Sequence, residues 1–149
     1  MTQAYVLDTG VLSTITHPAA TPANTQCLEW LVAAIGRGIT VAIPEIADYE
    51  LRRELLRAGK TVSVKKLDDL ERLLPYRPLT TRAMRIAAEL WADVRNRNLP
   101  TASDDALDAD VILAAQAREL QDEGCQVTVA TANVGHLSRL VAAGRWQDL

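Results

Sequence analysis

The sequence predicts an α/β protein, a three-layer α/β/α sandwich built around a central parallel sheet. Short apolar runs alternate with longer helical patterns, and this alternation is typical of βαβ units, whose right-handed crossovers place helices on both faces of a sheet. No linker, repeat or low-complexity segment interrupts the 149 residues. A chain of this length buries a sizeable core, so we expect one domain over residues 1–149.

Five short runs predict the strands, about as many as one small sheet needs. Their continuous apolar character is typical of parallel strands that are buried on both faces. The third run is the weakest, and the fifth lies at the end of the printed sequence. The predicted strands cover residues 4–8, 39–43, 77–79, 127–130 and 145–149.

Six helical patterns lie between these runs, and start and stop signals bound most of them. Ser, Thr, Asn and Asp are preferred as N-caps, Pro occurs in first turns, and Gly or Pro ends helices. On this basis Asn24 or Thr25 caps the first helix, Ser63 the third and Ser103 the fifth. The predicted helices cover residues 24–38, 44–59, 63–75, 80–98, 103–124 and 136–144.

The composition narrows the class of protein. A net charge of −3 gives no basic excess of the kind that nucleic-acid-binding proteins usually carry. Cys27 and Cys125 form no CxxC motif, and we interpret them as thiols of a reducing compartment. No leader-like segment begins the sequence, and no apolar stretch approaches the ~20 residues that cross a membrane. We therefore expect a cytoplasmic protein with no membrane partner.

Polar side chains follow two of the predicted strands. Asp8 ends the first strand, in "YVLDTGVLS", and Asn133 follows the fourth. Taken alone, each is a typical turn residue. The ligand site of a parallel sheet lies outside the carboxyl ends of its strands. The two side chains would therefore share a site if their strands are neighbours.

A further acid, Asp110, lies on the packing side of its predicted helix. The residues at i+3, i+4 and i+7 from it are Leu113, Ala114 and Ala117, all apolar. Burying an ionised carboxylate costs several kcal/mol unless a cation or hydrogen bonds compensate. Glu50 lies at the edge of the apolar stripe of its own helix, where a solvated glutamate is the ordinary interpretation.

Carboxylates that share a small site cannot all stay ionised without a cation. If Asp8, Glu50 and Asp110 meet at one edge of the sheet, their oxygen atoms suit a hard ion, which favours Mg²⁺ or Mn²⁺. Zinc is disfavoured because the chain lacks the usual Cys and His combinations. We interpret His17 and His136 as surface or helix-end residues.

Four segments, in this order, resemble the PIN domain, the nuclease fold of VapC-type toxins. They are "LDTGVLS" near the start, "IPEIADYELRREL" after the second strand, "DVILAAQA" opening a late helix and "VATANVGHL" after a late strand. The late helix start together with the Thr-x-Asn strand end is the more specific part. The likeness extends through the whole chain in order and spacing, and it implies a five-stranded parallel sheet.

The resemblance also implies a ribonuclease that depends on Mg²⁺ or Mn²⁺ and cleaves RNA phosphodiester bonds. Its catalytic and metal-binding acids fall on Asp8, Glu50 and Asp110 in this chain. The fourth acidic position of the family falls on Asn133. That departure removes one charge from the site, so the number of metal ions, one or two, stays open.

The resemblance suggests two supporting residues and two alternatives. Thr9 would support Asp8 through its hydroxyl, and Asp108 could supply the carboxylate that is missing at the fourth position. Glu45 and Glu54 lie close to Glu50 in the sequence, so either could take its place.

Three partners follow from the resemblance: an RNA substrate, an antitoxin protein and a second copy of the chain. The candidates for holding the RNA backbone are Arg52, Arg53 and Arg85. They would give a local positive charge although the net charge of the chain is negative. Trp30 and Trp91 add apolar surface that a homodimer would cover, although both also fit an ordinary core, Trp30 more so.

Other functions fit the sequence less well. Haloacid-dehalogenase-like enzymes need a second acid two residues after the first, where this chain has Gly10. A receiver domain needs an acid pair near Asp8 and a lysine at a strand end, and dinucleotide binding needs GxGxxG after the first strand. The alternative that stays open is an inactive or RNA-processing PIN-like module that binds nucleic acid and is not paired with an antitoxin.

Overall fold

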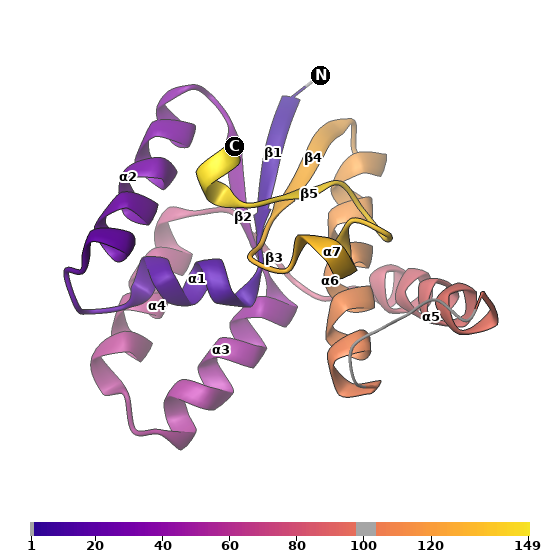
Figure 1. Ribbon diagram of the computed structural model, residues 1–149, viewed down its shortest axis with the longest axis horizontal. Coiled ribbons are helices and arrows are strands. Elements are labelled where there is room, and N and C mark those ends of the chain that lie inside the picture. The colour runs from indigo at the N-terminus through magenta and orange to yellow at the C-terminus, as the bar shows by residue number, and fades with distance from the viewer. Residues whose placement is uncertain (1, 98–103) are drawn as a thin grey trace.

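Five parallel strands form one sheet in the described part of the chain. The structure is a computed structural model that describes residues 2–97 and 104–149. The strands lie in the order β3-β2-β1-β4-β5, with β1 at the centre (Figure 1). Every pairing is parallel, as the sequence predicts. The strands are β1 (Thr2–Leu7), β2 (Thr40–Pro44), β3 (Tyr76–Arg77), β4 (Cys125–Ala130) and β5 (Ala143–Gly144).

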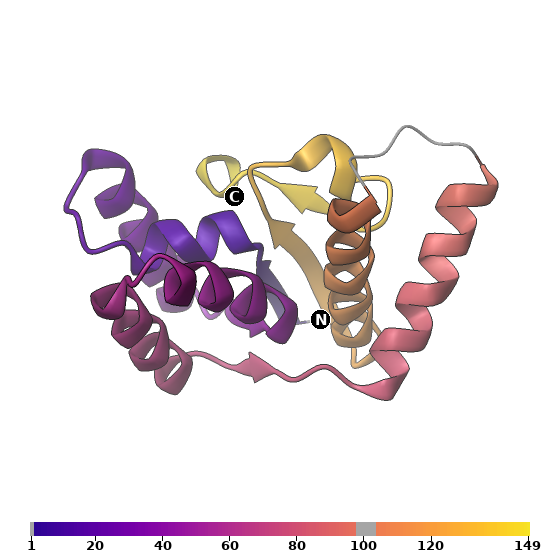
Figure 2. The same ribbon diagram turned by 90° about the horizontal axis from the view of Figure 1, so that it is seen from below.

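Helices enclose the sheet on both sides, which confirms the predicted three-layer sandwich. Helices α1 to α4 lie on one side of the sheet, and α5 and α6 lie on the other (Figure 1, Figure 2). The helices are α1 (Thr9–Thr16), α2 (Pro22–Gly36), α3 (Glu45–Arg57), α4 (Thr61–Leu73), α5 (Thr81–Asn96), α6 (Asp104–Asp122) and α7 (Val134–Leu137), with a 3-10 turn at Trp146–Asp148.

The central strand β1 is buried on both faces, and its side chains alternate between two cores. Ala4 and Val6 belong to the core with α5 and α6, whereas Tyr5 and Leu7 belong to the core with α1 to α4. This period of two follows from the pleat of a strand. Because both faces are covered there, residues 4–7 form a continuous apolar run, and the polar side chain that follows it, Asp8, marks the edge of the sheet.

Two predicted helix caps are wrong. Helix α2 begins two residues earlier than expected, because the Thr21 hydroxyl accepts a hydrogen bond from the Asn24 N–H at 3.2 Å and Pro22 occupies the first turn. Ser63 is buried inside α4, which begins at Thr61. The predicted cap Ser103 lies outside the described residues.

The C-terminal segment also differs from the prediction. No strand forms at 145–149, where Trp146–Asp148 is a 3-10 turn, and the helix predicted at 136–144 is limited to α7. The reason is pairing with β4: the Thr131 N–H donates to the Gly144 carbonyl at 3.0 Å, which draws β5 into the sheet. Helix α1 was not predicted, and it begins at its N-cap Asp8.

The structure also describes the two cysteines and the membrane-spanning potential of the helices. Cys27 is a buried free thiol and Cys125 a partly buried one. Of the described helices, none combines the length and apolar character needed to span a bilayer.

A buried glutamine in α6 holds the segment that carries Glu50. The Oε1 atom of Gln116 accepts a hydrogen bond from the Ile46 N–H at 3.2 Å, in the first turn of α3. Its Nε2 atom donates to the Arg77 carbonyl at 2.7 Å, in β3. Gln116 is 1% exposed. Both ends of its amide are therefore satisfied by backbone groups that water cannot easily reach.

We predict that Gln116→Leu destabilises the protein. The substitution leaves the Ile46 N–H and the Arg77 carbonyl without partners, and each such buried group costs about 1–3 kcal/mol. The melting temperature should fall by at least about 4 °C in a thermal denaturation experiment. Gln121→Leu, at an exposed position of the same helix, is the control and should shift it by less than about 2 °C. Equal melting temperatures for the two variants would contradict the role of Gln116.

Candidate active site

Asp8 accepts a hydrogen bond on each of its carboxylate oxygens. It follows β1 and caps α1, where its Oδ1 accepts from the Thr9 N–H at 2.7 Å. Its Oδ2 accepts from the Thr131 hydroxyl at 2.6 Å. The first bond satisfies a backbone donor at the helix start, and the second joins the ends of two neighbouring strands. The orientation of this carboxylate is therefore set by the fold.

Thr131 is a site residue that the sequence analysis missed. It follows β4 directly, is fully buried, and its hydroxyl also accepts a hydrogen bond from the Asn133 N–H at 2.9 Å. A buried hydroxyl is nearly always hydrogen-bonded. The available signal was its place in "VTVATAN", directly after an apolar strand. That place predicts a buried polar group at the edge of the sheet.

Glu50 projects from α3 toward the start of α1. Its Oε1 accepts a hydrogen bond from the Thr9 hydroxyl at 2.8 Å. The expectation that this hydroxyl supports Asp8 is therefore corrected: Thr9 gives its backbone N–H to Asp8 and its hydroxyl to Glu50. The cause is the position of the first turn of α1 next to α3. Thr9 therefore orients the carboxylates of both Asp8 and Glu50.

Asp110 is a partly buried acid of α6 that lies within the field of the other two. Burial is the largest cause that raises the pKa of Asp110 to about 6, and the negative charges of Asp8 and Glu50 add to it. The charge of His136 acts in the opposite direction. No residue in the described part of the chain donates a hydrogen bond to the Asp110 carboxylate. The protein itself therefore leaves this acid poorly compensated.

The other predicted site residues lie at the margin of this group or outside it. Asn133 is exposed and caps the short α7 without a side-chain hydrogen bond to it. Asp108 is also exposed and lines a cavity of about 280 Å³ beside Glu50, between α3 and α6. Glu45 accepts a hydrogen bond from the Leu79 N–H at 2.7 Å, and Glu54 pairs with an arginine on the surface.

The three predicted arginines have different surroundings. Arg52 donates hydrogen bonds to the carboxylates of Asp48, Asp68 and Glu71 and thereby joins α3 to α4. Its guanidinium therefore has a structural role and is not open to RNA. Arg53 is exposed, lies 4.0 Å from Glu50 and lines the same cavity. Arg85 is exposed on α5, on the other side of the sheet.

The donor chemistry of Asp8, Glu50 and Asp110 fits a hard divalent cation. All three offer carboxylate oxygens, and Asp110 is the acid whose charge the protein compensates least. Mg²⁺ typically uses one or two carboxylates and completes its shell with water and substrate phosphate. Among the side chains that the structure describes, those of residues 2–97 and 106–149, no three His, Cys, Asp or Glu side chains are grouped closely enough to hold an ion by themselves.

The family follows from a comparison with known domains. A model of the PIN domain matches residues 5–134, which include the three acids. The chain belongs to the PIN domain family. This confirms the resemblance that the four sequence segments indicate. A comparison of this PIN domain with curated protein sequences finds no match.

Solved structures similar to this PIN domain share its whole fold at low sequence identity. VapBC2 from Rickettsia felis, bound to a DNA fragment from their promoter, is 19% identical with a TM-score of 0.73. FitAcB from Neisseria gonorrhoeae is 22% identical with a TM-score of 0.64. VapBC-1 from nontypeable Haemophilus influenzae is 12% identical with a TM-score of 0.65. Each match covers 97% of this chain and 99% of the other.

We predict that Asp110→Asn stabilises the metal-free protein at neutral pH. The folded state raises the pKa of Asp110 from 3.8 to about 6, so ionised Asp110 destabilises the fold above pH 6, and this cost disappears as the pH falls toward 4. Asparagine imitates the neutral carboxyl. Thermal melts in EDTA should therefore show a higher melting temperature for the variant at pH 7.5 and a shrinking difference toward pH 4.

The control for this experiment is Asp108→Asn, which changes an exposed acid of the same helix. It should leave the melting temperature nearly unchanged at both pH values. If Asp110→Asn is no more stable than the wild type at pH 7.5, the carboxylate is better compensated than its surroundings indicate.

Proposed function

We propose that this PIN domain is an endoribonuclease that uses Mg²⁺ or Mn²⁺ to hydrolyse RNA phosphodiester bonds. The observation that carries the proposal is the convergence of Asp8, Glu50 and Asp110, from β1, α3 and α6, at one edge of the sheet. The family supports a hydrolase of this kind. Burial, together with the negative charges of Asp8 and Glu50, raises the pKa of Asp110. This supports a role for a cation, because a nearby positive charge would stabilise the ionised carboxylate.

The residues divide the chemical roles among them. Asp8 and Asp110 would hold the ion, with Asp8 kept in orientation by Thr9 and Thr131. When bound, the ion supplies positive charge to the reacting phosphodiester and makes water a better nucleophile at neutral pH. Glu50 would position the ion or accept the proton of the attacking water, and its hydrogen bond from Thr9 fixes one oxygen for that purpose.

Arg53 is the arginine best placed to hold RNA beside these acids. Its guanidinium lies over the Tyr49 ring, 5.0 Å from the centroid, and its side chain is 58% exposed at the cavity beside Glu50. Such a group can bind a phosphate without first breaking a buried ion pair. Arg85, exposed on α5, is a more distant candidate for binding the RNA backbone.

We predict that Asp8→Asn, Glu50→Gln and Asp110→Asn each reduce RNA cleavage by at least about 100-fold. Each removes one of the converging charges and retains the side-chain shape. The measurement is cleavage of structured RNA with Mn²⁺ and with EDTA, which should abolish it. Glu54→Gln, at a surface position of the same helix as Glu50, is the matched control and should cleave at nearly the wild-type rate.

Two results would contradict this proposal. Cleavage that persists in EDTA would exclude an obligatory ion. Wild-type protein that binds RNA but does not cleave it with Mn²⁺ or Mg²⁺ would favour the inactive nucleic-acid-binding module instead.

We further propose that the chain is the toxin of a type II toxin-antitoxin pair. The support is the sequence resemblance to VapC-type toxins, together with fold similarity to proteins solved as VapBC complexes. The test is to co-express the chain with a small DNA-binding protein encoded immediately upstream of it. An antitoxin should co-purify with the chain and suppress its nuclease activity, whereas an unrelated neighbouring protein should do neither.

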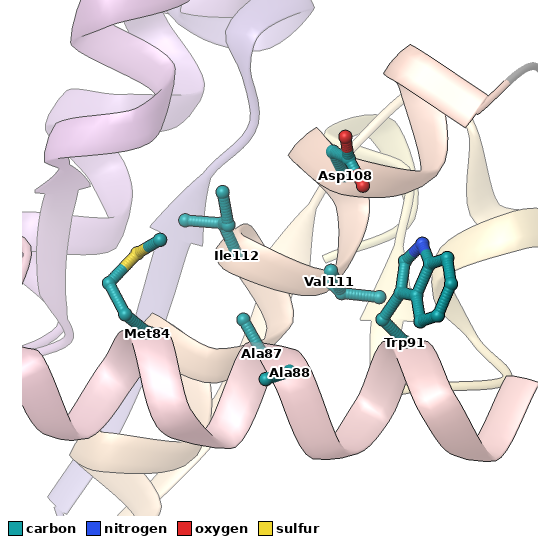
Figure 3. Close-up of a pocket in the computed structure, with 7 residues that line it drawn as sticks. All are labelled: Met84, Ala87, Ala88, Trp91, Asp108, Val111 and Ile112. Atoms are coloured by element: carbon teal, nitrogen blue, oxygen red, sulfur yellow. The ribbon is translucent and has the colours of Figure 1, made fainter.

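An apolar groove between α5 and α6 supports a homodimer. Figure 3 shows Met84 and Trp91 of α5 facing Val111 and Ile112 of α6 across this groove, whose volume is about 380 Å³. Met84 is 46% and Trp91 41% exposed, which is unusual for side chains of this size. Trp30, in contrast, is buried and stacks on Tyr5, so it belongs to the core.

We predict a mass near twice the 16.3 kDa of the chain in light scattering. Trp91→Glu should shift the protein to monomer, because it places a charge in the apolar groove. Leu73→Glu, at an exposed apolar position of α4, should leave the dimer intact. A monomer mass for the wild type at every concentration would exclude the homodimer.

A further inference from the structure

We propose that a cavity beside Asp8 binds one nucleotide of the RNA, with the base inside and a phosphate on Arg145. The cavity has a volume of about 270 Å³ and lies between α1, the segment after β4 and the 3-10 turn. Gly10 and Ala132 line one part of it, and Arg145, Trp146 and Gln147 line another. The inference rests on the proposed nuclease function and adds a subsite that selects the RNA sequence.

Two hydrogen bonds connect the wall of this cavity to Asp8. The Thr131 hydroxyl donates to the Asp8 carboxylate at 2.6 Å, and the Thr131 N–H donates to the Gly144 carbonyl at 3.0 Å. Arg145 follows Gly144 directly, at the end of β5. Because β1, β4 and β5 are parallel neighbours, Arg145 emerges at the same edge of the sheet as the acids. A nucleotide in the cavity would therefore adjoin the candidate reaction centre.

The C-terminal wall of the cavity is held in place by the core. Trp146 lies 6.2 Å from Trp30 between ring centroids, and Leu149 packs against the core beneath α1 to α4. Leu149 also approaches Gly144 so closely that a Cβ atom there would lie 3.0 Å from its side chain. The C-terminal turn, drawn in yellow, lies beside α2, which carries Trp30 (Figure 1). The cavity is therefore largely preformed, as ligand sites usually are.

The groups that line the cavity are those that recognise single-stranded RNA. Trp146 presents an aromatic surface on which a base can stack, and the Gln147 amide has both a donor and an acceptor for a base edge. No described residue hydrogen-bonds the Gln147 amide. On the opposite side, a Cβ atom added to Gly10 would meet nothing within 4 Å, so the space above the start of α1 is open.

Arg145 can exchange its present partner for a phosphate. Its Nε lies 3.2 Å from Asp148 Oδ2, and the two side chains are 58% and 63% exposed. Such exposed ion pairs are weak, because water competes for both charges. A phosphate offers stronger, charge-assisted hydrogen bonds to the guanidinium. Arg145 would also supply positive charge at an edge where Asp8, Glu50 and Asp110 otherwise repel RNA.

Binding of a short, labelled single-stranded RNA in EDTA, followed by fluorescence anisotropy, tests the subsite without cleavage. Arg145→Ala should weaken binding by about 10-fold and flatten its salt dependence, because one phosphate contact is lost. Asp148→Asn should tighten binding, because it removes the competing carboxylate. Arg72→Ala is the matched control: Arg72 is an exposed arginine in a similar pair with Asp69 on α4, and its loss should leave the affinity nearly unchanged.

The base is tested with RNAs in which one position at a time is abasic. Wild-type protein should lose at least about 5-fold in affinity at one position, and Gln147→Ala should lose the preference for the base at that position. Equal affinities of Arg145→Ala and Arg72→Ala, or an abasic scan without a sensitive position, would overturn the subsite. Cleavage with Mn²⁺ is measured separately, so a wild type that binds RNA as expected but does not cleave it would count against the proposed nuclease function alone.

Discussion

The strands β1 and β4 pair in parallel along their whole lengths, from Thr2 opposite Cys125 to Leu7 opposite Ala130. Segments that are far apart in the sequence therefore end side by side, and the residues that follow, Asp8 and Thr131, meet through a hydrogen bond. Parallel strands always place their carboxyl ends at one edge. Glu50 and Asp110, from α3 and α6, lie at this same edge in the candidate site.

The acids at this edge are costly for the fold, and the protein compensates them unequally. Asp8 receives two hydrogen bonds and Glu50 one, all from Thr9 and Thr131. Asp110 receives none from the described residues, and burial is the largest cause that raises its pKa to about 6. In the proposed function, a bound cation would supply the compensation that the protein itself does not give to Asp110.

The sequence was sufficient for the fold, which depends on local periodicity, and it nominated Asp8 and Asp110 from their positions and Glu50 from the family resemblance. Asp110 could be assigned to the packing face of α6 from its apolar neighbours at helical spacing, and Asp8 from its place after an apolar run. Thr131 also had a signal of this kind, its place directly after an apolar strand, but the bond from Thr9 to Glu50 had none. That bond depends on how α3 approaches α1 in three dimensions, which no pattern along the chain encodes. The C-terminal segment differs from its prediction for the same reason. Pairing with β4 places the last strand at Ala143–Gly144, so the residues that follow form a turn.

We propose that Asp8, Glu50 and Asp110 together bind a divalent cation. Anomalous X-ray scattering from a crystal of the protein grown with Mn²⁺ tests it most directly, because the signal locates the metal without reference to activity. We expect a peak between the carboxylates of Asp8 and Asp110, at distances of about 2.0–2.6 Å from their oxygens, with Glu50 in direct or water-mediated contact. A crystal with Mn²⁺ only elsewhere on the protein, or with none at saturating concentration, would contradict it.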